Sequence, residues 1–350
     1  MKGVFFMYRK ELEQKFKDLY LNPEHCEPLV QVRVWGPRKY TIAEQLASPE
    51  KAMEQQLLDA QAHIELGDDW IPALRANFGT AQIAASFGCE VKEMKDSLPA
   101  CKSHILEDIE DVFSLKTPTM KDGLNEKVLE FEEYFMKNKP SWIQVQHPDV
   151  QSTFNSAHLI RGNDIIYDFY DSPDETRILL NKITDFMLTW IKEMKKPITD
   201  DTEWFYDSAG LWKGAARTSN CSLQLLSPDL YREFIKEQDE RFLRELGGGR
   251  VHYCGEHPQF FKDIFDIKSA TNVEVDSQFH HIHDICNIAP KEVSVSFIDW
   301  SNTRGNAAWL DRLLEQGAPE KRNILIQAKA QGSMDDAKRM YEKLKKALGC

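Results

Sequence analysis

The sequence predicts an α/β fold: a single (β/α)8 TIM barrel over residues 26–350, preceded by an N-terminal helical extension over residues 1–25. Three observations support this prediction. About eight short strand candidates lie along the chain, and helical segments separate the later ones at intervals of about 25 to 35 residues, which predicts parallel strands joined by crossover helices. A doubly wound sheet would show the same alternation, but no Gly-x-Gly-x-x-Gly follows the first strand and no Gly-x-x-x-x-Gly-Lys-Ser/Thr occurs.

The composition excludes several classes of protein. The 350 residues are 42% hydrophobic and 29% charged, as in a globular chain, and no linker or repeat marks a second domain. A net charge of −12 without a basic block argues against a nucleic-acid partner. No apolar run approaches the roughly 18 residues of a membrane span, and the N-terminus lacks a signal-peptide pattern. The seven widely spaced cysteines suit a reducing compartment, so we expect a cytoplasmic protein.

The first three strand candidates lie in the N-terminal half. Residues 29–35 (LVQVRVW) alternate apolar and polar positions, and a Gly-Pro pair ends them. A short apolar piece at residues 62–66 runs into a polar loop and is interpreted as the second strand, and residues 141–147 (SWIQVQH) as the third. Between the last two, the acidic segment at residues 105–113 is expected to form an exposed helix whose charges face solvent.

The middle of the chain contains two predicted helices. Residues 174–194 repeat apolar side chains at helical spacing. A fourth strand is expected near residues 221–226 (CSLQLL), before a helix that opens with Ser-Pro-Asp at residues 227–229 and ends at three glycines. Residues 250–255 (RVHYCG) then read as the fifth strand. The remaining strand candidates are residues 271–277, 293–300 and 323–330, and the remaining helical segments are residues 279–288, 307–316 and 334–348.

His252 and Cys254 form the most specific pair of polar residues at a predicted strand end. In a barrel the active site lies where strands run into their following loops. Side chains two residues apart on a strand point to the same face, so an imidazole and a thiolate could share one zinc ion. A catalytic zinc needs three protein ligands, and this pair supplies two. A packed cysteine beside a hydrogen-bonded histidine would explain the same pattern.

Several segments together resemble the uroporphyrinogen decarboxylase superfamily, especially its cobalamin-dependent methyltransferase branch. They are the helix start at residues 227–231 (SPDLY), the glycine-rich turn at residues 247–249, and residues 251–255 (VHYCG). Residues 168–191 and 67–88 also resemble segments of this superfamily. The resemblance covers roughly residues 25–348 and implies a single TIM barrel, in agreement with the strand count.

The methyltransferase branch implies a zinc ion held by His-x-Cys on the fifth strand and by a cysteine on the eighth. His252 and Cys254 match the first two ligands, but the eighth strand has no cysteine, so Cys221 is the expected third ligand, with Glu256 or His257 as further options. Zinc would hold a thiol as thiolate, the nucleophile that removes a methyl group from a corrinoid. We therefore expect a zinc-dependent methyltransferase that acts with a corrinoid protein or free methylcobamide and a thiol or other acceptor.

The decarboxylase branch implies an alternative, cofactor-independent reaction on uroporphyrinogen or a related polycarboxylate. Its catalytic carboxylate would be Asp68 or Asp69, and Arg38 would bind substrate carboxylates, although the branch's arginine motif is missing and Arg33 is the other nearby arginine. The two aspartates could equally form a loop turn or a helix cap. A second alternative is a noncatalytic protein that binds a corrinoid or another tetrapyrrole.

Aromatic and imidazole side chains near the predicted barrel mouth are candidates for binding a flat macrocycle. These candidates are Trp35, Tyr206, His280 and His281, although core packing and an exposed helix start would also explain them. Further aromatic residues near predicted loops are Trp70, Trp212 and Trp300.

Overall fold

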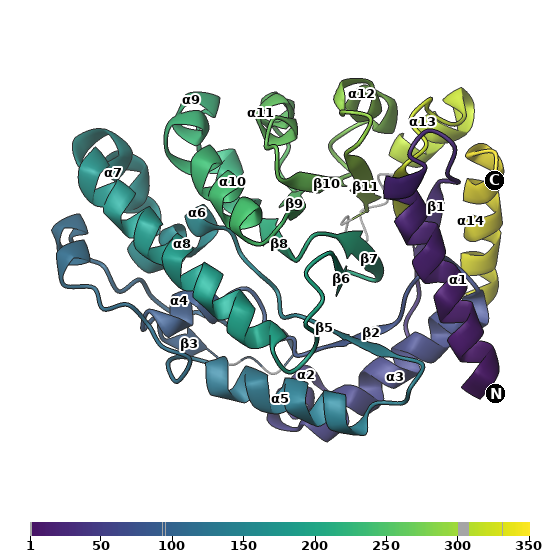
Figure 1. The fold of residues 1–350 in the computed structure, drawn as a ribbon, viewed down its shortest axis with the longest axis horizontal. Coiled ribbons are helices and arrows are strands. Elements are labelled where there is room, and N and C mark those ends of the chain that lie inside the picture. The colour runs from purple at the N-terminus through teal and green to yellow at the C-terminus, as the bar shows by residue number, and fades with distance from the viewer. Residues whose placement is uncertain (1, 93, 95, 300–307, 331) are drawn as a thin grey trace.

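A parallel sheet of six strands forms the centre of the molecule (Figure 1). The computed structural model describes residues 2–92, 94, 96–299, 308–330 and 332–350. Neighbouring strands of the sheet follow the order β1-β12-β11-β10-β9-β8, and every pair is parallel. The strands are β1 (Leu29–Arg33), β8 (Ala216–Ser219), β9 (Gly249–Tyr253), β10 (Ala270–Asp276), β11 (Ser294–Ile298) and β12 (Ile324–Lys329).

Two more parallel strands, β2 (Ala73–Arg75) and β5 (Gln144–Gln146), pair with each other in a separate ladder. Backbone contacts of residues that flank this ladder reach both edges of the six-stranded sheet, including a parallel bridge between Gln151 and Ser219. The Asp69 amide donates to the Val30 carbonyl of β1, and the Ser152 amide donates to the Ser219 carbonyl of β8, at 3.0 Å in both cases. The predicted α/β class with parallel strands is therefore confirmed. Closure into a barrel stays a prediction, because no ladder among the described residues joins β1 to β2 or β5 to β8.

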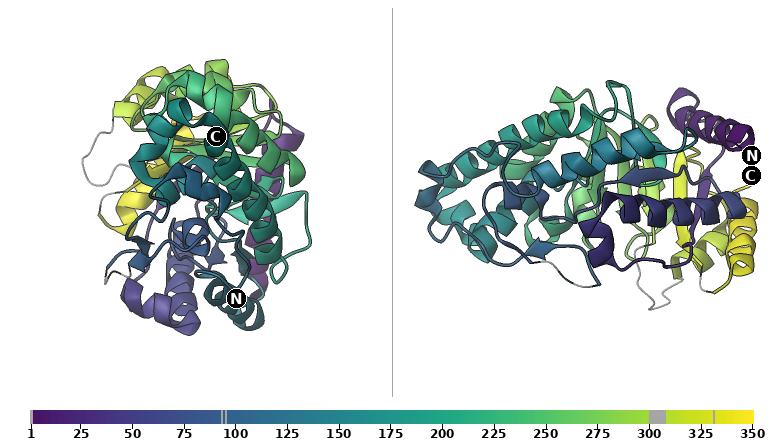
Figure 2. Two further views of the ribbon diagram at one scale, coloured as in Figure 1. Left: turned by 90° about the vertical axis from the view of Figure 1, so that its left-hand side faces the viewer. Right: turned by 90° about the horizontal axis from the view of Figure 1, so that it is seen from below.

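Helices surround the two ladders, and the chain ends lie at the same end of the long axis (Figures 1 and 2). Two antiparallel hairpins, β3 (Val91–Lys92) with β4 (Ala100–Cys101) and β6 (Trp204–Asp207) with β7 (Gly210–Lys213), complete the strands. The α-helices are α1 (Lys2–Leu21), α2 (Ile42–Ala47), α3 (Pro49–Leu66), α4 (Gln82–Ser86), α5 (Asn125–Asn138), α6 (Thr153–Arg161), α7 (Ile165–Asp171), α8 (Pro173–Lys195), α9 (Pro228–Leu230), α10 (Lys236–Glu245), α11 (Phe261–Phe265), α12 (Ile282–Ile288), α13 (Ala308–Gln316) and α14 (Met334–Ala347).

The predicted second strand, residues 62–66, is wrong. These residues form the last turns of α3, which Ser48 caps at its start and Gly67 ends in the left-handed conformation at φ 76°. Ala60, His63 and Leu66 are buried, at spacings that place them on one face of a helix. The second strand is β2, which begins seven residues after α3 ends.

The fourth strand also lies elsewhere than predicted. It is β8, and the predicted segment at residues 221–226 instead begins with the 3₁₀ turn η3 (Cys221–Leu225). The acidic segment at residues 105–113 contains the 3₁₀ helix η1 (Ile109–Phe113), which buries Ile109 and Val112 and leaves its acids exposed. No helix in the described part of the chain is long and apolar enough to cross a membrane.

Candidate metal centre

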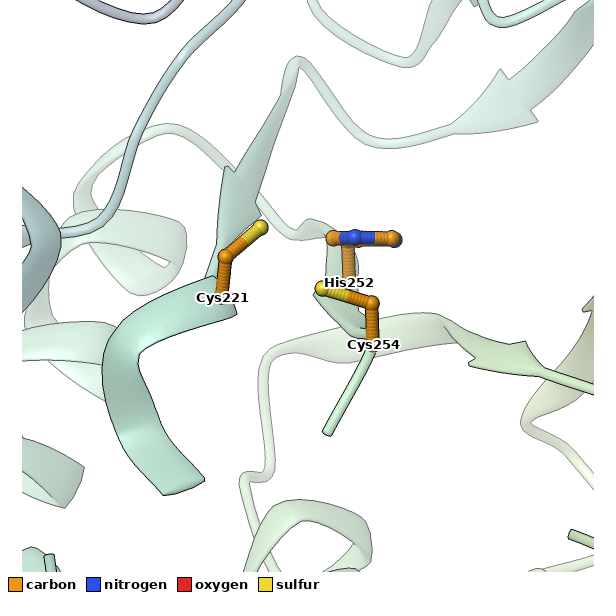
Figure 3. Close-up of side chains that lie close together, drawn as sticks. All are labelled: Cys221, His252 and Cys254. Carbon is orange, nitrogen blue, oxygen red and sulfur yellow. The ribbon is translucent and has the colours of Figure 1, made fainter. Parts of the chain in front are cut away.

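Cys221, His252 and Cys254 lie together at the carboxyl ends of β8 and β9 (Figure 3). Ser219 pairs with His252 in the parallel ladder, so the two strands end at the same level. Cys221 therefore opens its turn next to the point where Cys254 leaves β9. The three potential ligand atoms all lie within 4.8 Å of one another. The fold thus brings together the three residues that the sequence predicted as metal ligands.

The three side chains differ in burial and in the pKa shifts of their titratable groups. His252 is buried, whereas both cysteines are half-buried. A hydrogen bond from Cys221 lowers the pKa of the Cys254 thiol, while burial opposes this shift. The same contact with Cys254, reinforced by burial, raises the pKa of Cys221. The Cys221 thiol therefore donates to the Cys254 sulfur, and a divalent cation that binds both sulfurs would displace their protons.

Glu274 fixes the orientation of the His252 ring. The two residues pair in the β9–β10 ladder, and Glu274 Oε1 lies 2.6 Å from His252 Nδ1. Burial opposes protonation of the imidazole, but the Glu274 carboxylate and Cys221 outweigh it and raise the pKa of His252 to about 9. Because Nδ1 contacts the carboxylate, Nε2 is the ring nitrogen that would coordinate a metal ion.

Two buried arginines keep the carboxylate of Glu274 ionised. The Arg250 guanidinium contacts Glu274, and its Nη1 donates to Asp207 at 2.5 Å. Arg250 also stacks on the Trp212 ring at 3.8 Å. Burial alone would raise the pKa of Glu274, but Arg250, His252 and Arg217 hold it well below its usual range. A network of paired, buried charges therefore lies next to His252. We call it the lattice, and its members are Glu274, Arg250, Arg217 and Asp207.

Asp207 is the second acid of this lattice. Its Oδ1 accepts a hydrogen bond of 2.7 Å from Arg75 Nη2, and Arg217 Nη1 lies 3.7 Å from its Oδ2. These arginines and Arg250 outweigh burial and hold the pKa of Asp207 far below its usual range. Removing one member of such a buried network would leave its partners unpaired, so each side chain fixes its neighbours.

A cavity of about 880 Å³ reaches this lattice. Glu274 is part of the cavity wall, so the cavity extends to the residue that orients His252. Aromatic and cationic side chains line the rest of the wall, among them Trp35, Trp70, Arg33 and Arg75. A cavity of this size can enclose a small organic molecule.

The predicted catalytic residues Asp68 and Asp69 bind the backbone of β1. Asp68 Oδ2 accepts from the Val32 amide at 2.8 Å, and Asp69 Oδ2 accepts from the Val30 amide at 2.9 Å. Both residues are buried, and Lys15 pairs with Asp69 at 2.8 Å. The two carboxylates therefore join the segment after α3 to the central sheet. Their catalytic role stays a prediction.

Arg38 and Trp35 both line the cavity, and their contact with a ligand stays a prediction. The Arg38 guanidinium lies 5.1 Å from the centre of the Trp35 ring and 3.5 Å from Asp59. Tyr206 is positioned differently: its hydroxyl donates to Glu13 of α1 at 2.7 Å, and it is not part of the cavity wall. Trp300 lies outside the described residues.

Of the two histidines predicted to bind a macrocycle, His280 is buried next to the candidate metal centre. His280 Nε2 lies 2.8 Å from the carbonyl oxygen of Gly255, and burial lowers the pKa of this histidine. Its contact holds the backbone that follows Cys254. His281 is half-buried at the start of α12. Neither Glu256 nor His257 joins the candidate ligand cluster in the described part of the chain.

Sequence reasoning missed the lattice residues Glu274, Arg250, Arg217 and Asp207. A signal for two of them exists in the strand alternation. Arg250 shares a face of β9 with His252, and Glu274 shares a face of β10 with Asp276 near the end of the predicted strand at residues 271–277. Charged residues on a face that also carries a candidate ligand indicate a buried polar network.

Comparison with known proteins supports the fold. The chain is similar to a structure described as a methyltransferase from Methanosarcina mazei, with a TM-score of 0.66 and 16% identity over 97% of this chain and 98% of that one. No family model matches the chain, and no curated protein matches it.

Proposed function

We propose that this chain is a zinc-dependent methyltransferase that transfers a methyl group from a corrinoid to a thiol or another acceptor. The observation that carries the proposal is the cluster of Cys221, His252 and Cys254 at adjoining strand ends. The description of the M. mazei structure as a methyltransferase supports the same class of reaction. The expected methyl donor is a corrinoid protein or free methylcobamide.

The donor set of the cluster fits zinc. Two thiolates and one imidazole are ligands that zinc prefers, and three protein ligands leave the fourth position for a substrate. Ligand atoms bonded to one zinc ion at about 2.0 to 2.3 Å lie roughly 3.3 to 3.8 Å apart, so the cluster needs only a small contraction to bind the ion. When bound, zinc would lower the pKa of an acceptor thiol and keep it as a thiolate.

The residues around the cluster hold His252 in the orientation that zinc binding requires. Glu274 accepts a hydrogen bond from His252 Nδ1 and so leaves Nε2 as the ring nitrogen that would bind the ion. Arg250 and Arg217 hold the pKa of Glu274 well below its usual range and so maintain this contact, and because the pKa of His252 is raised to about 9, the ion would replace a proton on Nε2 at neutral pH. The cavity wall includes Glu274 but none of the three cluster residues, so the acceptor would have to approach the cluster past Glu274.

Four residues are proposed to contact the corrinoid. Trp35 lies at the cavity and is exposed, so its indole can contact the face of a macrocycle. His280 and His281 lie in the segment between β10 and α12, and His280 contacts the loop that carries Cys254. Tyr206 keeps this proposed role only if its hydrogen bond to Glu13 breaks.

A decarboxylase remains the second candidate, because the arginines of the cavity could bind substrate carboxylates. Arg33, Arg38 and Arg75 all line the cavity. The candidate carboxylates Asp68 and Asp69 instead contact β1, which favours the methyltransferase. Release of CO₂ from uroporphyrinogen under anaerobic conditions would support the decarboxylase.

A cobalamin spectral shift without turnover in either assay would support the noncatalytic binding protein.

Zinc content and methyl transfer together test the proposal. We expect about one zinc ion per chain after loading with zinc and removal of excess metal, and demethylation of methylcobalamin in the presence of a thiol. Cys254→Ser should lose both properties. The buried cysteine Cys286 lies outside the cluster, so Cys286→Ser is the matched control and should keep both. Zinc that remains bound in Cys254→Ser, or a zinc-loaded enzyme inactive with every thiol and corrinoid tested, would overturn the proposal.

A further inference from the structure

Cys89 and Cys101 form a second thiol pair outside the candidate metal centre. They lie at the two ends of the β3–β4 hairpin, where Val91 pairs with Cys101. A hydrogen bond of 2.8 Å from the Lys102 amide to the Glu90 carbonyl continues the pairing toward Cys89. The two sulfur atoms are in hydrogen-bonding contact with each other. Both thiols are free in the structure.

The two thiols differ in exposure, as the cysteines of a reactive pair commonly do. Cys89 is 3% exposed, its amide donates to the Ala84 carbonyl, and its sulfur contacts the Leu159 carbonyl at 3.7 Å. Cys101 is half-buried on the hairpin. The hydrogen bond from Cys89 lowers the pKa of Cys101. Cys101 is therefore the thiol that an oxidant reaches first, and Cys89 is positioned to attack it afterwards.

The hairpin between these cysteines builds part of the cavity wall. Asp96 and Leu98 line the cavity. The returning backbone lies directly against Gly79, because a Cβ atom at Gly79 would be 2.8 Å from the Pro99 carbonyl oxygen and 3.1 Å from Leu98 Cβ. A covalent link between Cys89 and Cys101 would consequently fix both ends of this wall segment.

We propose that Cys89 and Cys101 form a reversible disulfide with each other when a low-molecular-weight disulfide such as oxidised glutathione oxidises them. This bond would fix the hairpin in the cavity wall. The Cys101 thiolate attacks one sulfur of glutathione disulfide, which breaks its S–S bond and releases one glutathione thiolate. The contact with Cys101 and burial raise the pKa of Cys89, so Cys89 must first lose its proton; its thiolate then attacks Cys101 Sγ and releases the second glutathione. Two cysteine thiols are oxidised, one glutathione disulfide is reduced to two thiols, and the two cysteine protons go to the released glutathiones.

Redox titration of the full chain tests the proposal. The Cys221→Ser/Cys254→Ser double variant removes the thiols of the metal centre, so the result does not depend on the proposed function. After equilibration in glutathione buffers, acid quenching, alkylation and denaturing trypsin digestion, we expect peptide 76–92 linked to peptide 96–102. Adding Cys101→Ser should leave Cys89 as an alkylated thiol. Two alkylated cysteines at every glutathione ratio, separate glutathione adducts, or linkage to another cysteine would overturn the proposal.

Native proteolysis tests the effect on the cavity wall. Lys92 is exposed on the hairpin, so trypsin can cleave after it in the folded protein. Oxidation should slow this cleavage several-fold, and reduction should restore it. Cleavage after exposed Lys268 should be unaffected and serves as the control site. A disulfide that forms without slowing cleavage after Lys92 would contradict the locking of the wall.

Discussion

His252 and Glu274 face each other across adjacent strands, with His252 Nδ1 and Glu274 Oε1 2.6 Å apart and both side chains buried. This contact decides which ring nitrogen is presented to the two cysteines. It also connects the candidate metal ligands to the arginine lattice below them. The proposed metal centre therefore depends on residues that do not themselves bind the ion.

Glu274→Gln should weaken zinc binding by about 10- to 100-fold, the range typical for loss of a partner that orients a ligating histidine. The neutral amide holds the imidazole less strongly and no longer neutralises the positive charge of Arg250. Competition with a chromophoric chelator measures the affinity, and circular dichroism confirms folding. Glu256→Gln alters an exposed acid close to Cys254 and is the matched control, with affinity expected to be unchanged. Equal affinities in the two variants would show that Glu274 does not support the site.

Arg250→Met should lower the free energy of unfolding by about 3 to 5 kcal/mol, because it leaves two buried carboxylates without their shared partner. Those carboxylates belong to Asp207 and Glu274. Urea unfolding monitored by tryptophan fluorescence measures the loss. Arg244→Met removes an arginine that is about half exposed and should change the value by about 0.5 kcal/mol or less. Similar losses in both variants would contradict a special role for the buried arginine.

Asp239 should make stability depend on pH. Burial raises the pKa of this carboxyl from 3.8 to about 7, although Asn220 donates a hydrogen bond to it. The folded state favours the neutral acid, so its stability is highest below the unfolded pKa and falls as pH rises toward 7. Relative to Asp239→Asn, the wild-type chain should lose roughly 2 to 3 kcal/mol of unfolding free energy between pH 5 and pH 8. Urea unfolding of both proteins at each pH measures these free energies. A difference between the two proteins that is the same at pH 5 and pH 8 would contradict the raised pKa.

Asp68→Asn should destabilise the fold by about 1 to 3 kcal/mol while zinc content stays unchanged, because the Val32 amide loses its charged acceptor. Thermal unfolding and metal analysis of the same sample check both parts. Asp96→Asn changes an exposed acid of the cavity wall and is the control for stability. Full stability combined with loss of decarboxylation activity on uroporphyrinogen would instead give Asp68 the catalytic role.

The sequence predicted those parts of the fold and site that depend on local patterns. Strands β9 to β12 were found because their alternation or apolar character is continuous, and His252 with Cys254 because residues two apart share a strand face. Residues 62–66 were misassigned because a short apolar run looks the same in a buried helix and in a strand. Glu274 was missed because its role arises from the register between β9 and β10, which is a non-local property.

X-ray absorption at the zinc edge of the zinc-loaded protein is the most direct test of the proposed metal centre. We expect two sulfur ligands at about 2.3 Å and a nitrogen ligand at about 2.0 Å, with one sulfur lost in Cys221→Ser. A spectrum with only nitrogen and oxygen ligands, or one that Cys221→Ser leaves unchanged, would contradict a metal centre built from Cys221, His252 and Cys254.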